Sequence, residues 1–149
     1  MSACTFFGHH DCPPSIKPKL REVLIELIEN RSVDTFYVGN KGAFDRLVRS
    51  VLRELVREYP SIGYAVVLER MPVMRNAEHE DCSDTLLPEG IEEIPPRFAI
   101  AWRNKWMLRR SEYVVTYVTH SWGGAAQFAE MATRQGKTVI GLAEFSLRS

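Results

Sequence analysis

The sequence has few cysteines and no long apolar segment. Its three cysteines, Cys4, Cys12 and Cys82, are odd in number and widely spaced, which argues against a disulfide framework. No apolar stretch approaches the ~20 residues that a membrane-spanning helix needs. The first residues also lack the basic start and apolar run of a signal peptide. We therefore expect a cytoplasmic protein that does not contact a membrane.

The chain also lacks an excess of charge of either sign. Its 19 Lys and Arg residues balance 19 Asp and Glu residues, so the formal net charge is 0. Sequence-independent binding of nucleic acid needs a clear basic excess, so we do not expect nucleic acid as a partner. The length of 149 residues, with 45% hydrophobic and 26% charged residues, is typical of one folded domain, which we expect to span residues 1–149.

Two common nucleotide motifs are missing as well. The chain contains no GxGxxG, so ordinary dinucleotide binding is not supported. Gly136-Lys137-Thr138 imitates the end of a phosphate-binding P-loop, but position 131 is Met instead of Gly, and an apolar strand pattern follows it. We reject that motif and expect no cofactor.

Short apolar runs alternate with helical patterns along the chain. This alternation is typical of βαβ units around a parallel sheet. We therefore predict an α/β fold, a Rossmann-like three-layer α/β/α sandwich with a mainly parallel five-stranded sheet. The expected strands are 5–7, 35–38, 64–68, 113–118 and 138–142, and the expected helices are about 15–29, 44–59, 98–110 and 125–132.

Residues 69–97 interrupt this alternation. They contain four prolines, Pro72, Pro88, Pro95 and Pro96, and no sustained periodicity. An irregular connection of this length inside a compact domain is usually functional or poorly ordered. We interpret the segment as a lid.

Two glycine-bearing loops each follow a strand and precede a helix. Gly123 and Gly124 lead into a helix rich in alanine, where unpaired backbone N–H groups and the absence of Cβ atoms favour a phosphate. The alternative is an ordinary tight turn. In Gly39-Asn40-Lys41-Gly42, Lys41 can neutralise a phosphate. Asp45 can accept a hydrogen bond from a ribose hydroxyl, or simply be a stabilising charge near a helix N-terminus. Together the two loops predict a nucleotide-type ligand.

Histidine and cysteine side chains gather in two places. His9, His10 and Cys12 share one loop, and His79 and Cys82 lie in the expected lid. The residue types suit zinc, but the spacing matches no paired-ligand motif, so no metal is expected. We interpret His9, His10 and His120 as hydrogen-bond donors around an anion, or one of them as an acid or base. Cys12 as a nucleophile is an alternative.

A basic cluster surrounds two tryptophans near residue 100. Its cations are Arg97, Arg103, Lys105, Arg109 and Arg110, around Trp102 and Trp106. Such a cluster is more often a solvated helix face than a nucleic-acid site. The tryptophans are more typical of a core or a dimer interface, and we expect a homodimer or larger homo-oligomer.

Several ordered motifs resemble the SLOG superfamily, which includes the SMF/DprA DNA-processing proteins, the LONELY GUY phosphoribohydrolases and the YpsA-like proteins. The motifs are FFGHHDCP, FYVGNKGAFD, RNKWM and VTHSWGGAAQF, and the resemblance extends over nearly the whole chain. Small bacterial and phage members of that superfamily are the most similar. The resemblance implies the Rossmann-like fold and association into homo-oligomers.

The resemblance to LONELY GUY enzymes implies particular positions. Those enzymes cleave the N-glycosidic bond of cytokinin nucleoside monophosphates, with an arginine before strand four and a PGGxGTxxE motif after it. The arginine corresponds to Arg103, and the motif to residues 119–127, with Gly124 in place of threonine and Gln127 in place of glutamate. A neutral amide provides neither the charge nor the base for glycosidic cleavage. The phosphate loop is thus retained and the hydrolytic carboxylate is not.

The sequence therefore predicts a protein that senses or sequesters a nucleotide-derived small molecule at the carboxyl ends of the strands. The predicted binding residues are Gly8, His9, His10, Gly39, Asn40, Lys41, Gly42, Asp45, Arg103, Thr119, His120, Ser121, Trp122, Gly123, Gly124 and Gln127. One alternative is a nucleotide N-glycosidic hydrolase. Its catalytic candidates are Arg103, Gln127 and Asp11, with Asp45, Glu89 or a lid histidine as other replacements for the glutamate. A further alternative is DNA binding like that of DprA.

Overall fold

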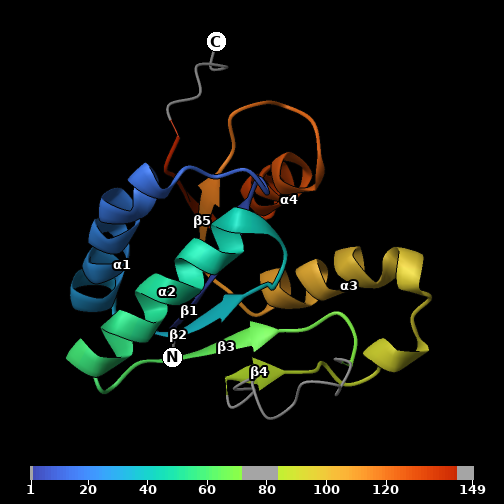
Figure 1. Cartoon of the computed structure of the whole chain (residues 1–149), viewed down its shortest axis with the longest axis horizontal. Helices are drawn as coiled ribbons and strands as arrows, with labels where there is room; N and C mark the ends of the chain where they lie inside the picture. Colours follow the sequence, from blue (N-terminus) through green and yellow to red (C-terminus); the bar gives the residue numbers. More distant parts are fainter. Residues whose placement is uncertain (1, 72–83, 144–149) are drawn as a thin grey trace.

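Strands and helices alternate along the chain in the computed structural model, which describes residues 2–71 and 84–143 (Figure 1). The strands are β1 (Ser2–Gly8), β2 (Val33–Val38), β3 (Gly63–Val67), β4 (Thr85–Leu86), β5 (Tyr113–Tyr117) and β6 (Thr138–Gly141). The α-helices are α1 (Lys17–Arg31), α2 (Gly42–Glu58), α3 (Pro96–Arg109) and α4 (Gly124–Arg134). Two short 3-10 helices, η1 (Pro14–Ile16) and η3 (Ile91–Glu93), precede α1 and α3.

The strands form one sheet in the order β4-β3-β2-β1-β5-β6, and every pairing is parallel. The predicted α/β Rossmann-like architecture is confirmed, but the sheet has six strands instead of five. The additional strand, β4, lies inside the segment 69–97 that we expected to be irregular. Because β4 is two residues long, it has no periodicity to detect. It exists through its pairing with β3.

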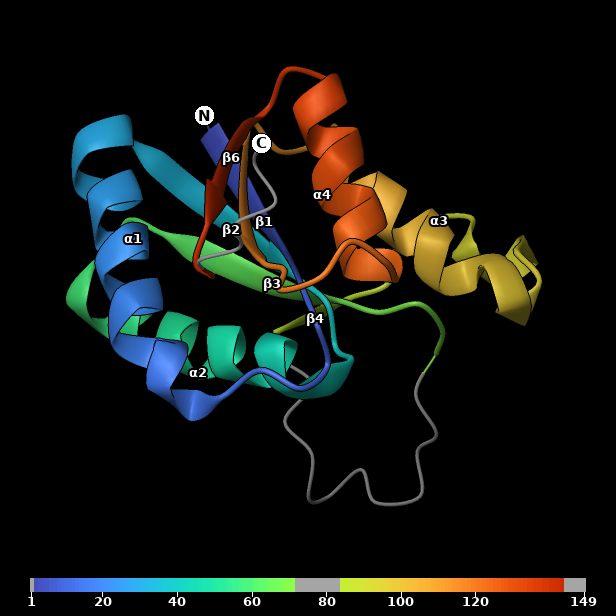
Figure 2. The same ribbon diagram turned by 90° about the horizontal axis from the view of Figure 1, so that it is seen from above.

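Helices cover both faces of the sheet (Figure 2). α1 and α2 lie over one face, and α4 lies over the other, with α3 beside it. The spacing of apolar residues along α2 explains its place, because Phe44, Val48, Val51, Leu52 and Leu55 are all fully buried against the sheet. Within the described ranges, no helix has both the length and the apolar character that crossing a membrane requires.

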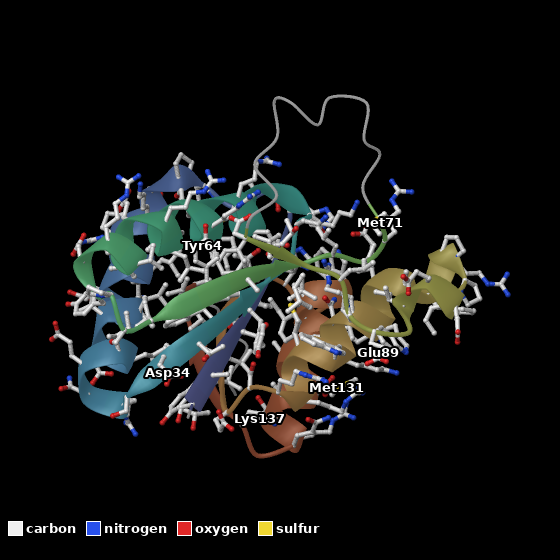
Figure 3. The ribbon with its side chains drawn as sticks, turned by 90° about the horizontal axis from the view of Figure 1, so that it is seen from below. Asp34, Tyr64, Met71, Glu89, Met131 and Lys137 are labelled. Atoms are coloured by element: carbon white, nitrogen blue, oxygen red, sulfur yellow. The ribbon has the colours of Figure 1, made fainter. Side chains whose placement is uncertain are left out.

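The carboxyl ends of the strands lie at one edge of the molecule. Figure 3 shows Asp34 and Lys137 near the amino ends of the strands, and Met71 beyond the carboxyl end of β3. The chain runs outward from β1 to β4 and then returns to the other side of β1 with β5, so strand order reverses between β1 and β5. In such sheets ligands bind beyond the carboxyl ends at this reversal. The topology therefore directs attention to the loops after β1, β2 and β5.

Gly8, the last residue of β1, permits close packing of α2 on this edge. A Cβ atom at position 8 would overlap the ring of Phe44, which is fully buried. We expect Gly8→Ala to lower the free energy of unfolding by roughly 1–3 kcal/mol, because the buried ring cannot retreat without strain. Urea denaturation measures the change. Gly63→Ala is the control, since a Cβ there meets no atom within 4 Å, and equal losses in both variants would contradict this explanation.

Candidate functional site

A cavity of about 250 Å³ lies at the carboxyl ends of β1 and β2. Its walls come from both sides of the strand reversal: the loops after β1 and β2, the side of α3 and the first turn of α4. We call it the switch-point cavity. The residues that line it are Phe6, Phe7, Gly8, His9, His10, Gly39, Lys41, Asp45, Ile100, Arg103, Asn104, Met107, Gly124 and Ala125. The two glycine-bearing loops singled out in the sequence thus share one cavity.

Arg103 forms part of the wall of the cavity from within α3. Its side chain is buried, with 2% of the residue exposed. Nη1 donates hydrogen bonds to Asn40 Oδ1 and to the Val67 carbonyl oxygen, both at 2.9 Å, and Nε donates to Asn104 Oδ1 at 3.0 Å. Arg103 therefore ties α3 to the ends of β2 and β3, and its charge faces the cavity from a fixed position.

This placement corrects our interpretation of the basic cluster as a solvated face. Arg97, Lys105, Arg109 and Arg110 are exposed, but Arg103 is buried. Burial lowers the pKa of its guanidinium, and the nearby carboxylates of Asp45 and Glu69 oppose that effect. Sequence spacing could not reveal this, because Arg103 is buried by the loops after β2 and β3, which come from distant parts of the chain. The ring of Trp106 packs edge-on against Tyr37 and under the Arg110 guanidinium.

Lys41 lines the cavity, and its ammonium group already forms an ion pair. Its Nζ lies 2.9 Å from Oε2 of Glu69, the second residue after β3. Glu69 is buried, with 7% of the residue exposed. A phosphate that enters the cavity therefore meets a lysine whose charge is shared with this carboxylate.

Asp45 lies in the first turn of α2 and lines the same cavity. Its Oδ2 accepts a hydrogen bond from the backbone N–H of Lys41 at 3.0 Å, and its carboxylate is close to Gly39 and Arg103. Burial raises the pKa of Asp45 from 3.8 to about 6, although the Lys41 amide, Arg103 and His10 act in the opposite direction. The group thus titrates closer to neutrality than an ordinary aspartate.

The raised pKa of Asp45 predicts a pH-dependent contribution to stability. The folded protein holds this proton more tightly than the unfolded chain, so the contribution is complete below about pH 3.8 and is lost as the pH rises through about 6. Relative to an Asp45→Asn variant, the wild type should lose on the order of 2–3 kcal/mol between those limits. Urea denaturation of both proteins from pH 3.5 to pH 7 measures the difference. A difference independent of pH would contradict the burial of this carboxylate.

The first turn of α4 closes the cavity opposite α2. Gly123 precedes the helix with a φ of 96°, a conformation that favours glycine, and no side chain caps its end. The backbone of Gly124 and Ala125 lines the cavity, without side chains large enough to cover it. The first N–H groups of an α-helix have no intrahelical acceptors and lie at the positive end of the helix dipole. The geometry therefore suits an anion.

Three aromatic rings stack beside this turn. The ring of His9 lies on that of His120 with centroids 3.7 Å apart, and His120 lies on Trp122 at 3.8 Å. His9 is 7% exposed and Trp122 is 68% exposed, so the stack runs from the interior to the surface. Burial and the neighbouring His120 lower the pKa of His9, which favours its neutral form. Nε2 of His9 and Nδ1 of His120 are buried, and neither has a hydrogen-bond partner within residues 2–71 and 84–143.

The stacking of His9 on His120 excludes one metal ion bound by both imidazoles. A metal ion lies in the plane of an imidazole that binds it, and the His9 and His120 planes are stacked with only 15° between them. One ion cannot lie in both planes. Among the described residues, no group of three or more His, Cys, Asp or Glu side chains is arranged to hold a metal. His79 and Cys82 lie outside those residues. Cys12 is buried, which raises the pKa of its thiol and disfavours the nucleophilic thiolate.

Several predicted residues lie outside the switch-point cavity. Asp11, Thr119, Ser121, Trp122 and Gln127 are exposed and do not line it. Gln127 donates its backbone N–H to the Gly123 carbonyl oxygen in the first turn of α4. Asn40 acts indirectly by holding Arg103, and Gly42 packs against His10 with a φ of 90°.

Sequence reasoning missed some residues of the site. Ile100, Asn104, Met107 and Ala125 line the cavity, and Glu69 holds Lys41. Only Glu69 had a usable signal, because an acidic residue that directly follows a buried strand lies at the ligand-binding edge of a parallel sheet. The spacing of residues along α3 did not identify its lining residues, since α3 has polar and apolar residues on all sides.

No protein-family model and no curated protein matches the sequence. Solved structures do match the fold. DNA processing protein A from Helicobacter pylori aligns with a TM-score of 0.67 at 13% identity, over 99% of this chain and 68% of that one. DNA processing protein A (DprA) from Streptococcus pneumoniae aligns with a TM-score of 0.71 at 13% identity, over 99% of this chain and 52% of that one. The chain has the fold of these proteins. This likeness confirms the predicted Rossmann-like fold.

The present chain is shorter than both of these proteins. It spans about half the length of the pneumococcal chain and about two thirds of the H. pylori chain. The H. pylori protein is described as having a unique mode of binding single-stranded DNA. At 13% identity the likeness establishes the shared fold, so the ligand of this chain has to be argued from its own cavity.

Proposed function

We propose that the switch-point cavity binds a nucleotide through its phosphate. The observation that carries this proposal is the first turn of α4: Gly124 and Ala125 line the cavity, and no side chain among the described residues caps this helix end. Helix N-termini of this kind are common phosphate-binding sites. Buried His9, whose Nε2 has no partner, lines the same cavity and supports a polar ligand there.

The charges around the cavity favour a ligand with one phosphate group over a ligand with a chain of phosphates. Lys41 and Arg103 are positive, but Glu69 and Asp45 lie against them. An anion is thus bound mainly by backbone N–H groups and by the small surplus of positive charge when Asp45 is protonated. Such a balance suits one phosphate group.

The exposed ring of Trp122 is a stacking surface for an unpaired base outside the switch-point cavity. It stacks on His120 on one side and is 68% exposed, close to the start of α4. A large aromatic ring at the surface can stack with a nucleobase, a contact worth about 1–3 kcal/mol. Trp122 does not line the cavity, so a base that stacks on it belongs to a longer ligand, such as an oligonucleotide, and not to a mononucleotide bound in the cavity.

Isothermal titration calorimetry with ribose 5-phosphate and a panel of nucleoside mono-, di- and cyclic phosphates tests the proposal. We expect measurable binding of ribose 5-phosphate and tighter binding of at least one nucleotide. Nucleosides without phosphate should bind far more weakly, because they leave the α4 turn without an anion. Absence of heat from every phosphate compound would contradict the proposal.

Single-stranded DNA is the second candidate ligand. The fold is shared with a protein described as binding single-stranded DNA, and the stack that ends at Trp122 provides a surface for an unpaired base. This candidate predicts that a short oligonucleotide binds more tightly than a mononucleotide, with affinity that falls as salt increases. Fluorescence anisotropy with labelled oligothymidylate at two salt concentrations distinguishes it from binding of free nucleotides.

Incubation of the protein with nucleoside monophosphates decides the hydrolase alternative. Asp45 is the carboxylate that lines the cavity among the described residues, and its pKa of about 6 suits a general acid. Chromatography of the incubated nucleotides detects released base. Base release that disappears in Asp45→Asn would assign catalysis to this site in addition to binding.

A further inference from the structure

Glu69 is a buried, charged side chain that phosphate binding does not use. Its Oε2 is paired with the Lys41 ammonium, but its Oε1 is buried and has no hydrogen-bond partner in the part of the chain that the structure describes. The Arg70 Nε is 4.0 Å from Oε2, too far for a hydrogen bond. An unpaired buried acceptor on a charged group is costly, and such groups in folded proteins call for a specific explanation.

A second hollow provides that explanation. It has a volume of about 500 Å³ and lies along the start of α3, and Glu69 lines it. We call it the α3 hollow. Lys41 and Ile100 line both this hollow and the switch-point cavity, so the two are adjacent. Most of its remaining wall is apolar, from Met71, Ile91, Ile94, Pro96 and Ala99.

The two spaces differ in the chemistry that they present. The switch-point cavity offers backbone N–H groups, whereas the α3 hollow offers mainly apolar walls, the buried carboxylate of Glu69 and the exposed carboxylate of Glu92. Neighbouring strands are about 4.8 Å apart, so the end of β3 lies on the order of 10 Å from the end of β1, with β2 between them. A ligand that spans both spaces has an anionic end, a flat apolar part and a hydrogen-bond donor at the far end.

We infer that Glu69 recognises the amino group of a nucleobase, so that the site prefers adenine, cytosine or guanine nucleotides over uracil and thymine nucleotides. This inference rests on the proposed binding of a nucleotide phosphate in the switch-point cavity. The base lies in the α3 hollow against Ile100 and Ala99, and its amino group donates to Oε1. The terminal torsion of a glutamate is soft, so this oxygen can turn toward the hollow. A carboxylate repels the carbonyl oxygens that flank the N–H of uracil.

Lys41 connects the two spaces. Its Nζ holds Oε2 of Glu69, which leaves Oε1 for a ligand, and its side chain also reaches the cavity in which the phosphate is proposed to bind. One lysine thus stays paired with the base-reading carboxylate as that carboxylate turns toward the hollow, and it contributes positive charge near the phosphate. Recognition of the two ends of a nucleotide is therefore coupled through this residue.

Matched pairs of nucleotides test the inference. Cytidine and uridine monophosphates differ in an amino group against a carbonyl group, and adenosine and purine riboside monophosphates differ by the amino group alone. We expect the wild type to bind the amino-bearing member of each pair about tenfold more tightly or better, since a partner lacking the donor leaves the carboxylate unpaired. Glu69→Gln keeps the shape and an oxygen for Lys41, but its amide N–H₂ donates, so the preference should disappear or reverse.

The control variant is Glu92→Gln, because Glu92 lines the same hollow but is exposed. It should keep the wild-type preference. Ribose 5-phosphate has no base, so it should bind equally to the wild type and to Glu92→Gln. It should bind at least as tightly to Glu69→Gln, in which Lys41 no longer shares its charge with a carboxylate. If ribose 5-phosphate and every nucleotide fail to bind, the proposed function fails and the inference with it. If they bind but the wild type does not discriminate, or Glu69→Gln discriminates like the wild type, the inference alone is overturned.

Discussion

Replacing Gly124 by aspartate should lower the affinity for nucleoside monophosphates by roughly 100-fold. The new carboxylate would lie at the first position of α4, where Gly124 lines the switch-point cavity. Two unit charges about 4 Å apart repel by ~4 kcal/mol near a protein surface, and part of this is lost to screening by salt. Since each 1.4 kcal/mol is about tenfold in affinity, the expected loss is large. Calorimetric titration measures it.

The same substitution should not weaken the fold. A Cβ atom at position 124 meets no atom within 4 Å, and the backbone there is not left-handed. An acidic side chain in the first turn of a helix typically stabilises it by about 0.3–1 kcal/mol. The variant should therefore unfold at the same temperature as the wild type or slightly higher, so that loss of binding cannot be attributed to loss of structure.

Ala126→Asp is the charge-matched control for this experiment. Ala126 lies in the same helical turn but lines a different groove, between α4 and β6. The Ala126→Asp variant places the same charge near the same helix end, away from the switch-point cavity. We expect only a few-fold loss of affinity in this variant. Equal losses in Gly124→Asp and Ala126→Asp would show that the phosphate does not lie against Gly124.

Arg103→Met should produce the largest loss of stability among single substitutions at the site. It removes the donor that Asn40, Asn104 and the Val67 carbonyl oxygen share. It also leaves the buried carboxylate of Glu69 and that of Asp45 without a nearby guanidinium. Removing one partner of a buried charge network costs about 3–5 kcal/mol. For a chain of this size the midpoint of thermal unfolding should fall by roughly 6–20 °C.

Arg109→Met is the control for the stability measurement. Arg109 lies at the end of the same helix and is exposed, so its replacement should change the free energy of unfolding by no more than about 0.5 kcal/mol. Urea denaturation of the three proteins gives the comparison. A loss within 1 kcal/mol for Arg103→Met would mean that the contacts of its guanidinium do not hold α3 to the sheet.

The sequence was sufficient to predict the α/β/α layers of the fold and the order of its helices and main strands. Apolar residues three and four apart along α2 predicted its buried face, which comprises Phe44, Val48 and Leu52 among others. The strands β1, β2, β3, β5 and β6 were predicted because buried parallel strands are nearly continuous apolar runs. β4 was not, since two residues have no pattern and their pairing with β3 is a tertiary contact.

The candidate site was predictable as far as local rules apply. Glycines after strands identified the loops around Gly39 and Gly124, because parallel strands bring their carboxyl ends to one edge. The state of each side chain was not predictable. The burial of Arg103, the pairing of Lys41 with Glu69 and the stacking of His9 on His120 all join residues far apart in the sequence. Such contacts depend on how α3 and the loops pack in three dimensions.

The most direct test of this account is a titration of the ¹⁵N-labelled protein with adenosine monophosphate, followed by amide resonances in heteronuclear NMR spectra. We predict that the largest shifts occur at Gly124 and Ala125, with smaller shifts at Gly39 and His9, which line the same cavity. Ribose 5-phosphate should shift the amides of Gly124 and Ala125 in the same direction. Shifts confined to other surfaces, or a spectrum unchanged at millimolar nucleotide, would contradict a phosphate site at the start of α4.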